Sequence, residues 1–250
     1  MSVIVGWRRA FAVLSSVAAV FAAAPGAQAI VHGKAVSQAR FVRDYPWAVA
    51  LENPVSGSVC SGVLVSPTHV LTAAHCTAAN KRVLYGNASR RRARRIGVVK
   101  AIPHPGYDRH TGQFDVGLLR LSEALPIRPI SLISEAGYLL LVNPDALARV
   151  MGWGKRPGTG YSDKLVVADI RLHWLTRRGT YLYYDNQGGP CGGDSGGPMV
   201  VRGLGRKPVL VGVASTTNGN LCAKGGGIAA YTNIVAVRRF IEDNVKDLPD

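Results

Sequence analysis

The hexapeptide Gly193-Asp194-Ser195-Gly196-Gly197-Pro198 decides how this chain is interpreted, because it places one hydroxyl in a stretch that regular secondary structure cannot hold. Four of its six residues are glycine or proline, which excludes the interior of a helix or of a central strand. Glycine lets the backbone turn tightly, so the amides of Gly193 and Ser195 are free to point at one spot. Taken alone, such a stretch is more often an ordinary turn. A serine hydroxyl becomes a good nucleophile only beside a base.

Two other stretches offer that base and a carboxylate to orient it. His75 follows the apolar segments 63–65 and 70–71, so it is expected just past the end of a strand. Asp115 begins an apolar run that continues over 116–121. Singly, the histidine would be structural and the aspartate a turn or capping residue. Their order along the chain, His then Asp then Ser, is that of the chymotrypsin arrangement and differs from the subtilisin and α/β-hydrolase orders.

At this point the chain resembles the chymotrypsin/trypsin family of serine endopeptidases. The resemblance implies an all-β fold of two packed six-stranded antiparallel β-barrels with a C-terminal α-helix, the boundary between barrels lying near 125–145. The matching motifs run in family order from residue 30 to the C-terminus and are Ile30-Val31-His32-Gly33, Tyr45-Pro46-Trp47, Cys60-Ser61-Gly62, Thr72-Ala73-Ala74-His75-Cys76, Asp115-Val116-Gly117-Leu118, Gly152-Trp153-Gly154, the hexapeptide, and Tyr231-Thr232-Asn233-Ile234.

The apolar pattern independently predicts many short strands. Short runs of Val, Leu and Ile are interrupted by Gly, Pro and Asn, as is typical of all-β chains. Only the tail, 234–245, has helical spacing, with apolar residues recurring at intervals of three and four. The expected strands are 47–51, 62–65, 83–85, 96–102 and 116–121 in the first half, and 149–153, 165–172, 199–201, 209–214 and 227–232 in the second.

Residues 1–29 are expected to be a secretory signal peptide and residues 30–250 the protease domain. Arg8-Arg9 precede an apolar stretch, 10–24, which Pro25-Gly26 ends, and Ala27-Gln28-Ala29 fits a small-x-small cleavage site. A membrane anchor is the alternative, but a bilayer needs roughly 20 apolar residues. We therefore expect a secreted, extracellular protein with no membrane span in its mature form.

Cleavage after Ala29 would make Ile30 the new N-terminus, which is also where the family motifs begin. The resemblance implies that the Ile30 ammonium pairs with the carboxylate of Asp194 and orders the loop that carries Ser195. An aspartate buried beside that serine would be costly without such a partner. The hypothesis is that signal peptidase itself releases the active enzyme.

Four cysteines in an oxidising compartment favour disulfides, and three pairings are open from the sequence alone. The resemblance implies Cys60–Cys76 beside the histidine and Cys191–Cys222 beside the serine loop. A zinc site is the competing interpretation, but no Cys-x-x-Cys spacing or histidine cluster supports it. We expect no metal and no other cofactor.

The resemblance also implies the roles of the site residues. His75 would take the proton of Ser195, Ser195 would attack a peptide carbonyl, and Asp115 would hold the imidazole in the right tautomer. The amides of Gly193 and Ser195 would donate to the oxyanion. The expected partners are protein or peptide substrates, and the expected state is a monomer.

The specificity pocket is inferred by counting from Ser195. Gly189 lies at the position that forms the base of the primary pocket, where an aspartate would select Lys or Arg and a glycine cannot. The walls fall near Thr217 and Ala229, and Ser215, Thr216 and Thr217 form the edge that pairs with substrate backbone. A threonine on one wall narrows the slot, so we expect a preference for small or medium apolar side chains.

The charge balance is strongly basic. Without Arg8 and Arg9, 28 basic residues stand against 15 acidic ones, a net charge of +13. Five of the cations lie in Arg90-Arg91-Arg92-Ala93-Arg94-Arg95, which is either a solvated loop or a landing site for polyanionic surfaces, cell-wall polymers or acidic proteins. No aromatic residues interleave with the run, so specific nucleic-acid binding is not expected. Residues 80–107 contain no carboxylate, which argues against a calcium loop there.

Two classes of function remain open. The favoured one is an active secreted serine endopeptidase, since His75, Asp115 and Ser195 are all present with Gly193 beside them. The alternative is a protease homologue that acts mainly by binding anionic surfaces through its basic patch. Covalent capture by a fluorophosphonate would separate the two.

Overall fold

A computed structural model describes residues 30, 32–77, 82–156, 160–172, 174–175, 181–185, 189–218 and 228–249 of the chain. For 174–175, 181–185, 206 and 218 the description covers the backbone alone. The expected signal peptide, 1–29, lies outside these residues. No helix in the described part of the chain is long and apolar enough to cross a bilayer.

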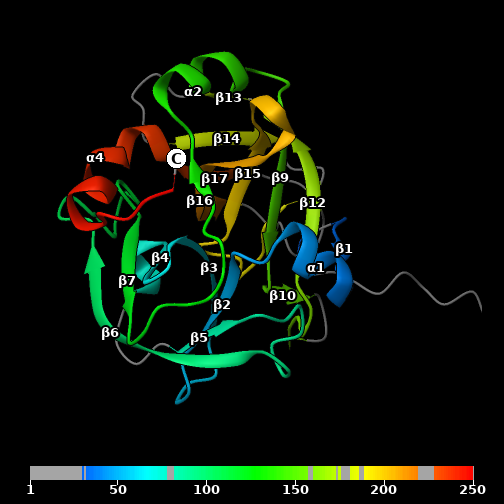
Figure 1. Ribbon diagram of the computed structural model, residues 1–250. Coiled ribbons are helices and arrows are strands. Elements are labelled where there is room, and N and C mark those ends of the chain that lie inside the picture. The colour runs from blue at the N-terminus through cyan, green and yellow to red at the C-terminus, as the bar shows by residue number, and fades with distance from the viewer. Residues whose placement is uncertain are drawn as a thin grey trace, which may run out of the picture.

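The first half of the chain closes into a six-stranded antiparallel barrel with the strand order β2-β3-β4-β7-β6-β5 (Figure 1). Leu51 and Leu64 are fully buried on one face of this closed sheet, and Leu71 and Leu118 on the opposite face, so the interior is filled by side chains and the outer face is covered there as well. The strands are β2 (Ala48–Glu52), β3 (Val59–Ser66), β4 (His69–Thr72), β5 (Arg82–Tyr85), β6 (Arg94–Pro103) and β7 (Gly117–Leu121).

Strand β3 joins the two halves of the molecule. All eight of its residues are buried, because one face lines the barrel and the strand also packs against β9 (Leu147–Gly152) and β15 (Pro198–Arg202) of the second half. Its sequence, Val-Cys-Ser-Gly-Val-Leu-Val-Ser, is accordingly almost free of bulky polar groups. The segments that carry His75 and Ser195 both contact this strand, through the Cys60–Cys76 disulfide and the hydrogen bond from the Ser61 amide to the Ser195 carbonyl.

The second half forms a nine-stranded sheet with the order β1-β12-β9-β15-β16-β17-β14-β13, with β8 pairing parallel to β16. The first predicted barrel is thus confirmed, whereas the second is not, because no pairing among the described residues joins β1 to β13. Both end strands are only two residues long. The remaining strands are β1 (Lys34–Ala35), β8 (Ser131–Leu132), β12 (Val166–Arg171), β13 (Trp174–Leu175), β14 (Tyr181–Asp185), β16 (Pro208–Asn218) and β17 (Ile228–Asn233), and a separate hairpin pairs β10 (Lys155–Arg156) with β11 (Gly160–Tyr161).

The predicted C-terminal helix is present as α4 (Ile234–Asn244). Asn233 caps it by accepting a hydrogen bond from the amide of Val235 at 3.0 Å. Its apolar stripe is buried, and Phe240 contacts the ring of His104 at a centroid distance of 4.8 Å. In Figure 1 this red helix lies beside the first barrel, although it follows the last strand of the second sheet.

Two further helices show that the prediction of helix in the tail alone was wrong. They are α1 (Gln38–Asp44) and α2 (Glu135–Leu141), each seven residues long. Ser37 and Ser134 cap them, each accepting from the backbone amide three residues later. Helices this short cannot display a clear apolar period, so the capping serines were the only available signal. The described residues also include two 3₁₀ turns, η1 (Ala74–Cys76) and η2 (Leu204–Arg206).

Candidate active site

Two paired strands bring His75 and Asp115 together. His75 lies in η1, three residues after Thr72 at the end of β4, and Asp115 lies two residues before β7. β4 and β7 are antiparallel, with Thr72 opposite Gly117, so both side chains emerge at the same end of the barrel. The ring Nδ1 of His75 is 2.8 Å from Asp115 Oδ2, and the backbone amide of His75 donates to Oδ1 at 3.1 Å.

This double contact fixes the orientation of the imidazole. Since a buried carboxylate accepts from the ring at Nδ1, the proton is assigned there and Nε2 is the nitrogen left free to accept another. The His75 side chain is 36% exposed and the Asp115 side chain 1% exposed. One member of the pair is therefore open to a reactant while the other is shielded from water.

The second half of the chain holds Asp115 from the other side. Ser215 Oγ in β16 donates to Asp115 Oδ2 at 2.7 Å, and Thr232 Oγ1 in β17 donates to the Asp115 carbonyl at 3.0 Å. Burial by itself would raise the pKa of Asp115, but the hydrogen bonds and charge of His75 and the hydroxyl of Ser215 outweigh it. The pKa of Asp115 therefore lies below its ordinary value. The carboxylate remains ionised beside the ring.

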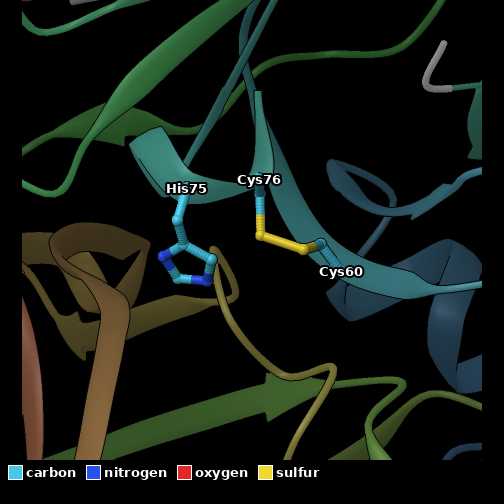
Figure 2. Close-up of side chains that lie close together, drawn as sticks. All are labelled: Cys60, His75 and Cys76. Carbon is cyan, nitrogen blue, oxygen red and sulfur yellow. A yellow bond between two sulfur atoms is a disulfide. The ribbon is translucent and has the colours of Figure 1, made fainter. Parts of the chain in front are cut away.

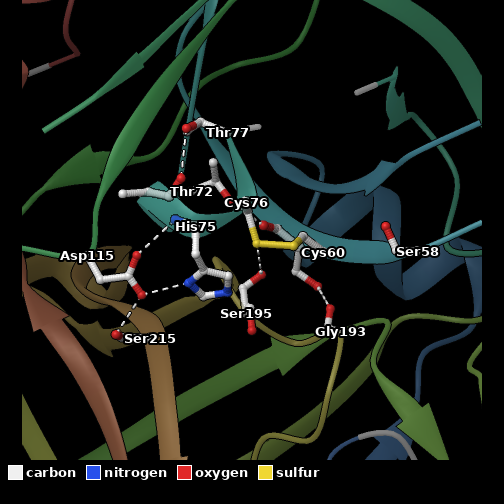
Figure 3. Close-up of a disulfide and its surroundings, with 12 residues drawn as sticks. Ser58, Cys60, Thr72, His75, Cys76, Thr77, Asp115, Gly193, Ser195 and Ser215 are labelled. Atoms are coloured by element: carbon white, nitrogen blue, oxygen red, sulfur yellow. Dashed lines mark hydrogen bonds and ion pairs between the residues drawn. A yellow bond between two sulfur atoms is a disulfide. The ribbon is translucent and has the colours of Figure 1, made fainter. Parts of the chain in front are cut away.

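Ser195 lies in the turn that precedes β15, against β3 and β4. Its carbonyl accepts from the amide of Ser61 at 2.8 Å and lies 3.7 Å from Cys76 Sγ. Figure 3 shows the His75 ring between the Asp115 carboxylate and Ser195. Among the described residues, the Ser195 hydroxyl has no hydrogen bond to the ring, whereas the Asp115–His75 bond is already formed.

The glycines of the hexapeptide are required by this close approach. Gly196 has φ of 80°, and a Cβ there would collide with the Thr72 hydroxyl and the carbonyl of Ser61. Gly193 has φ of 97°, and a Cβ there would lie 2.6 Å from the ring of Tyr161. Only glycine meets both the conformation and the space at these positions.

Two amides of the turn have no acceptor among the described residues. The amides of Asp194, Gly196 and Gly197 donate to backbone carbonyls at 2.7–2.9 Å. Within the described residues, those of Gly193 and Ser195 donate to none. Two donors from one tight turn therefore stay available to an oxygen of a bound molecule.

The carboxylate of Asp194 is completely buried behind this turn. Oδ1 accepts from the amide of Gly154 at 2.7 Å and Oδ2 from the amide of Cys191 at 2.8 Å. Burial raises the pKa of Asp194 to about 7, and the two hydrogen bonds only partly oppose it. No cation of the described residues pairs with it. The Gly-Trp-Gly motif provides the space, because a Cβ on Gly152 or Gly154 would overlap the carboxylate.

Ile30 is buried near the same sheet but is not paired with Asp194. Its carbonyl accepts from Gly33 at 2.7 Å, and the following strand β1 sets Ala35 opposite Val166, which itself lies opposite Gly152. In this chain Ala29 precedes Ile30, so the Ile30 nitrogen is an uncharged amide. An ion pair at this point requires cleavage of the chain.

A disulfide between Cys60 and Cys76 ties β3 to the turn that carries His75. The side chains of Cys60, His75 and Cys76 lie close together (Figure 2), and their possible metal-ligand atoms are within 4.8 Å of one another. Both sulfurs are consumed in the disulfide, so no thiolate is present to bind a metal. Cys191 is also disulfide-bonded. Its expected partner, Cys222, lies outside the described residues.

A cavity of about 50 Å³ adjoins Ser195 and is lined by residues 190–192 and 214–217. Ser215, Thr216 and Thr217 thus lie where the pocket was expected. Gly189 and Ala229 are buried but do not line the cavity. Ala229 lies opposite Thr217, a lining residue, in the β16–β17 pairing. No described lining residue is charged.

Sequence reasoning missed the contacts of Ser215 and Thr232 with Asp115. Ser215 was expected only on the substrate-binding edge, and Thr232 was noted only as part of a motif. Their hydroxyls reach Asp115 because the sheet of the second half lies against the first barrel. Strand composition carries no signal for that placement.

Comparisons with known proteins identify the family of this chain. Residues 30–241 match the family model described as Trypsin. The chain is 33% identical over 216 residues to a trypsin of Saccharopolyspora erythraea, covering 78% of this chain and 90% of that protein. It is 31% identical to human kallikrein-14 over 81% of this chain and 80% of the relative, and 31% identical to rat granzyme-like protein 1 over 76% and 80%.

The family match covers the barrel, the sheet and most of α4, and it begins at the residue where the sequence motifs begin. The relatives are similar over most of their own length. The chain belongs to the trypsin family of serine endopeptidases.

Proposed function

We propose that this protein is a secreted endopeptidase in which Ser195 is the nucleophile, His75 the general base and Asp115 the residue that orients the base. The observation that carries the proposal is the 2.8 Å bond between His75 Nδ1 and the buried Asp115 carboxylate, beside the turn that carries Ser195. It leaves Nε2 free on the exposed side of the ring, where a hydroxyl proton could be received.

In the proposed reaction His75 Nε2 takes the Ser195 proton as Oγ bonds to the peptide carbonyl carbon. The imidazolium then protonates the leaving amine as the C–N bond breaks, which leaves an acyl-enzyme. Water repeats the sequence, giving its proton to His75 and releasing the acid and the serine. Asp115 stays ionised and stabilises the cation through Nδ1, in keeping with its lowered pKa.

The negative oxygen of each tetrahedral intermediate is placed between the amides of Gly193 and Ser195. These are the amides of the turn that lack acceptors among the described residues. Removing one donor of this kind typically costs about 10²–10³ in rate.

Activation is proposed to follow removal of residues 1–29. The new ammonium of Ile30 would pair with Asp194, whose carboxylate is buried, has a pKa raised to about 7 and has no cation within the described residues. Pairing would restore the charged form of Asp194 and fix the turn that holds Gly193 and Ser195. The Ile30 side chain is already fully buried.

For specificity we propose small or medium apolar side chains at the residue before the scissile bond. The adjoining cavity is only about 50 Å³ and its described lining has no charge. Thr217 narrows it where a glycine would leave it open. Secretion and a monomeric state are proposed with the same assignment. The homologue without catalysis is not proposed, because no member of the catalytic set is missing from the sequence.

The test is a cleavage profile of the protein starting at Ile30 on a peptide library, with Ser195→Ala beside it. Ser56→Ala is the matched control, since Ser56 is exposed and its hydroxyl bonds only within its own loop. We expect cleavage after small or medium apolar residues, loss of turnover in Ser195→Ala, and full activity in the control. Rapid cleavage after arginine would overturn the specificity, and unchanged turnover in Ser195→Ala would overturn the mechanism.

A further inference from the structure

The arginine run does not lie uniformly in solvent. Arg90 is only partly exposed, its Nε donates to the Ser162 carbonyl at 2.8 Å, and its guanidinium lies 3.6 Å from Glu52. The backbone amides of Arg90 and Arg91 also bond to Asp163, at 2.7 and 3.1 Å. Arg90 therefore anchors the run to the second half of the molecule and is not part of a free basic surface.

The other cations of this region face solvent, and we call Arg91, Arg92, Arg94, Arg95 and Lys164 the basic strip. All five residues are exposed, and the Arg91 side chain is 88% exposed. Among the described residues of the strip, Arg91 alone forms an ion pair, with Asp163 at 4.0 Å. Within the described chain, the remaining four take part in no ion pair. The strip thus carries unneutralised charge.

A cavity of about 250 Å³ opens at one end of the strip, with Arg92 and Lys164 in its lining. Asp163 also lines it, but its carboxylate already accepts from the Ser89 hydroxyl at 2.8 Å and the Arg91 amide at 3.1 Å. Gln38 spans the far wall, bonding Gly86 and Ala88. The two cations are the charged groups left for a ligand, so the cavity suits an anionic side chain.

The strip begins close to the candidate active site. The Tyr161 ring fills the space beside Gly193, and the Lys155 ammonium lies 5.5 Å from the centre of that ring. Lys164 is three residues after Tyr161 and pairs with Ser89 through a β-bridge. Three residues of extended chain span at most about 11 Å. A substrate bound at Ser195 could therefore reach the strip within a few residues.

The direction of a bound substrate follows from the other side of the site. The acyl half is expected to pair with the edge at 215–217 and to enter the cavity there. With the acyl half in that cavity, the proposal places the leaving half past Gly193, toward Tyr161 and the strip.

We propose that the basic strip binds an acidic segment of polypeptide substrates, located about four to eight residues after the scissile bond. This inference rests on the proposed function and names the substrate class of that site. A polypeptide is favoured over other polyanions because the strip continues the exit path of the leaving half. Bidentate carboxylate binding suits its arginines, and charge of one sign near the site would accelerate encounter.

The experiment compares two quenched fluorescent peptides with the same scissile site, one with glutamates and one with glutamines at positions four to eight after it. With the protein starting at Ile30, kcat/KM should be about tenfold higher for the glutamate peptide at low salt. The ratio should fall toward one at about 1 M salt, where the screening length is near 3 Å. Moving the glutamates ahead of the scissile bond should remove the advantage.

The test variant is Arg92→Gln/Arg95→Gln/Lys164→Gln, and the matched control is Lys100→Gln/Arg120→Gln/Arg202→Gln, which removes three exposed cations elsewhere. The test variant should lose the preference for glutamate and keep kcat/KM for the glutamine peptide, while the control keeps the preference. Equal ratios in both variants would overturn the proposal, because the effect would then be one of net charge.

Binding separates this proposal from the proposed function. Ser195→Ala protein should bind the labelled glutamate segment by fluorescence anisotropy, and addition of the three strip substitutions should weaken that binding about tenfold. If no peptide is hydrolysed but this binding holds, the proposed function fails and the strip assignment stands. If the segment does not bind while a sulfated polysaccharide does, the assignment to an acidic polypeptide is wrong.

Discussion

Asp115 and Asp194 are both buried aspartates in the candidate active-site region, yet their pKa values are shifted in opposite directions. Asp115 accepts from the His75 ring, the His75 amide and the Ser215 hydroxyl, and its pKa lies below the ordinary value. Asp194 accepts from two backbone amides, and its pKa is raised to about 7. Desolvation acts on both, so the difference lies in the partners.

The contrast indicates which of the two carboxylates already has its negative charge stabilised in the uncleaved chain. Around Asp115, a base and a hydroxyl already stabilise the negative charge, so the Asp–His unit is assembled before any cleavage. Around Asp194, dipoles alone face the carboxylate, and within the described residues no cation does. In our account the missing cation is the ammonium of Ile30, which exists only after residues 1–29 are removed.

The largest expected effect on activity comes from replacing Asp115, whose contact with His75 is already formed. Asp115→Asn replaces the acceptor at Nδ1 with an amide that can hold the ring in the wrong tautomer. We expect kcat to fall by about 10⁴ with little change in KM. Steady-state kinetics on a small apolar substrate measures this, and a loss of less than tenfold would mean that Asp115 does not orient the base.

Replacing Asp194 should reduce activity less than replacing Asp115 does. In the uncleaved precursor it should increase stability. In the protein starting at Ile30, Asp194→Asn should lower kcat by about 10²–10³, since the turn with the two donors loses its ion pair. In the uncleaved chain with Ser195→Ala as background, the same substitution should be stabilising at neutral pH, because it removes an uncompensated buried charge.

The pH dependence of that stability has a definite sign. The folded precursor holds the Asp194 proton up to about pH 7, whereas the unfolded chain releases it near 3.8, the ordinary value. Unfolding therefore becomes easier as pH rises from about 4 to 7, by roughly 1.4 kcal/mol per pH unit, and levels off above 7. Denaturant unfolding at several pH values checks this. An Asn variant with the same slope would contradict it.

The smallest expected effect concerns the hydrogen bond that Asp115 accepts from Ser215 in the second half of the chain. Ser215→Ala removes one donor, so the unfolding free energy at pH 7 should fall by about 1.5–3 kcal/mol and the pKa of Asp115 should rise. Asp115 stabilises the fold above its ordinary pKa of 3.8, and that stability is lost as pH falls through its lowered folded pKa. The difference between variant and wild type should thus shrink in acid. Thr216→Ala is the control, and an equal loss there would remove the special role of Ser215.

The sequence predicted those parts of the site that depend on local chemistry. The hexapeptide could be recognised from the sequence because positions 193 and 196 require glycine. Both have positive φ, and both lie too close to neighbouring segments for a side chain. His75 and Asp115 follow because each adjoins a strand of the first barrel. The apolar stripe of α4 could be predicted from the sequence alone, since its buried residues recur at intervals of three and four positions.

Features that depend on packing between distant segments could not be predicted. The bonds of Ser215 and Thr232 to Asp115 require the sheet to lie against the barrel, which no strand composition specifies. The arginine run looked uniform, yet Arg90 turns inward because Ser162 and Glu52 lie within its reach. The space around Asp194 depends on Gly152 and Gly154, because a side chain at either position would overlap the carboxylate, and the motif alone does not show which group needs that space.

The central claim is that His75 activates the hydroxyl of Ser195, and covalent labelling tests it most directly. Protein starting at Ile30 is exposed to a fluorophosphonate and its intact mass is measured, with Ser195→Ala and His75→Ala treated alongside. We predict one adduct, located on Ser195, absent from Ser195→Ala and formed far more slowly in His75→Ala. An unlabelled but folded and correctly processed protein, or equal labelling rates with and without His75, would contradict the account.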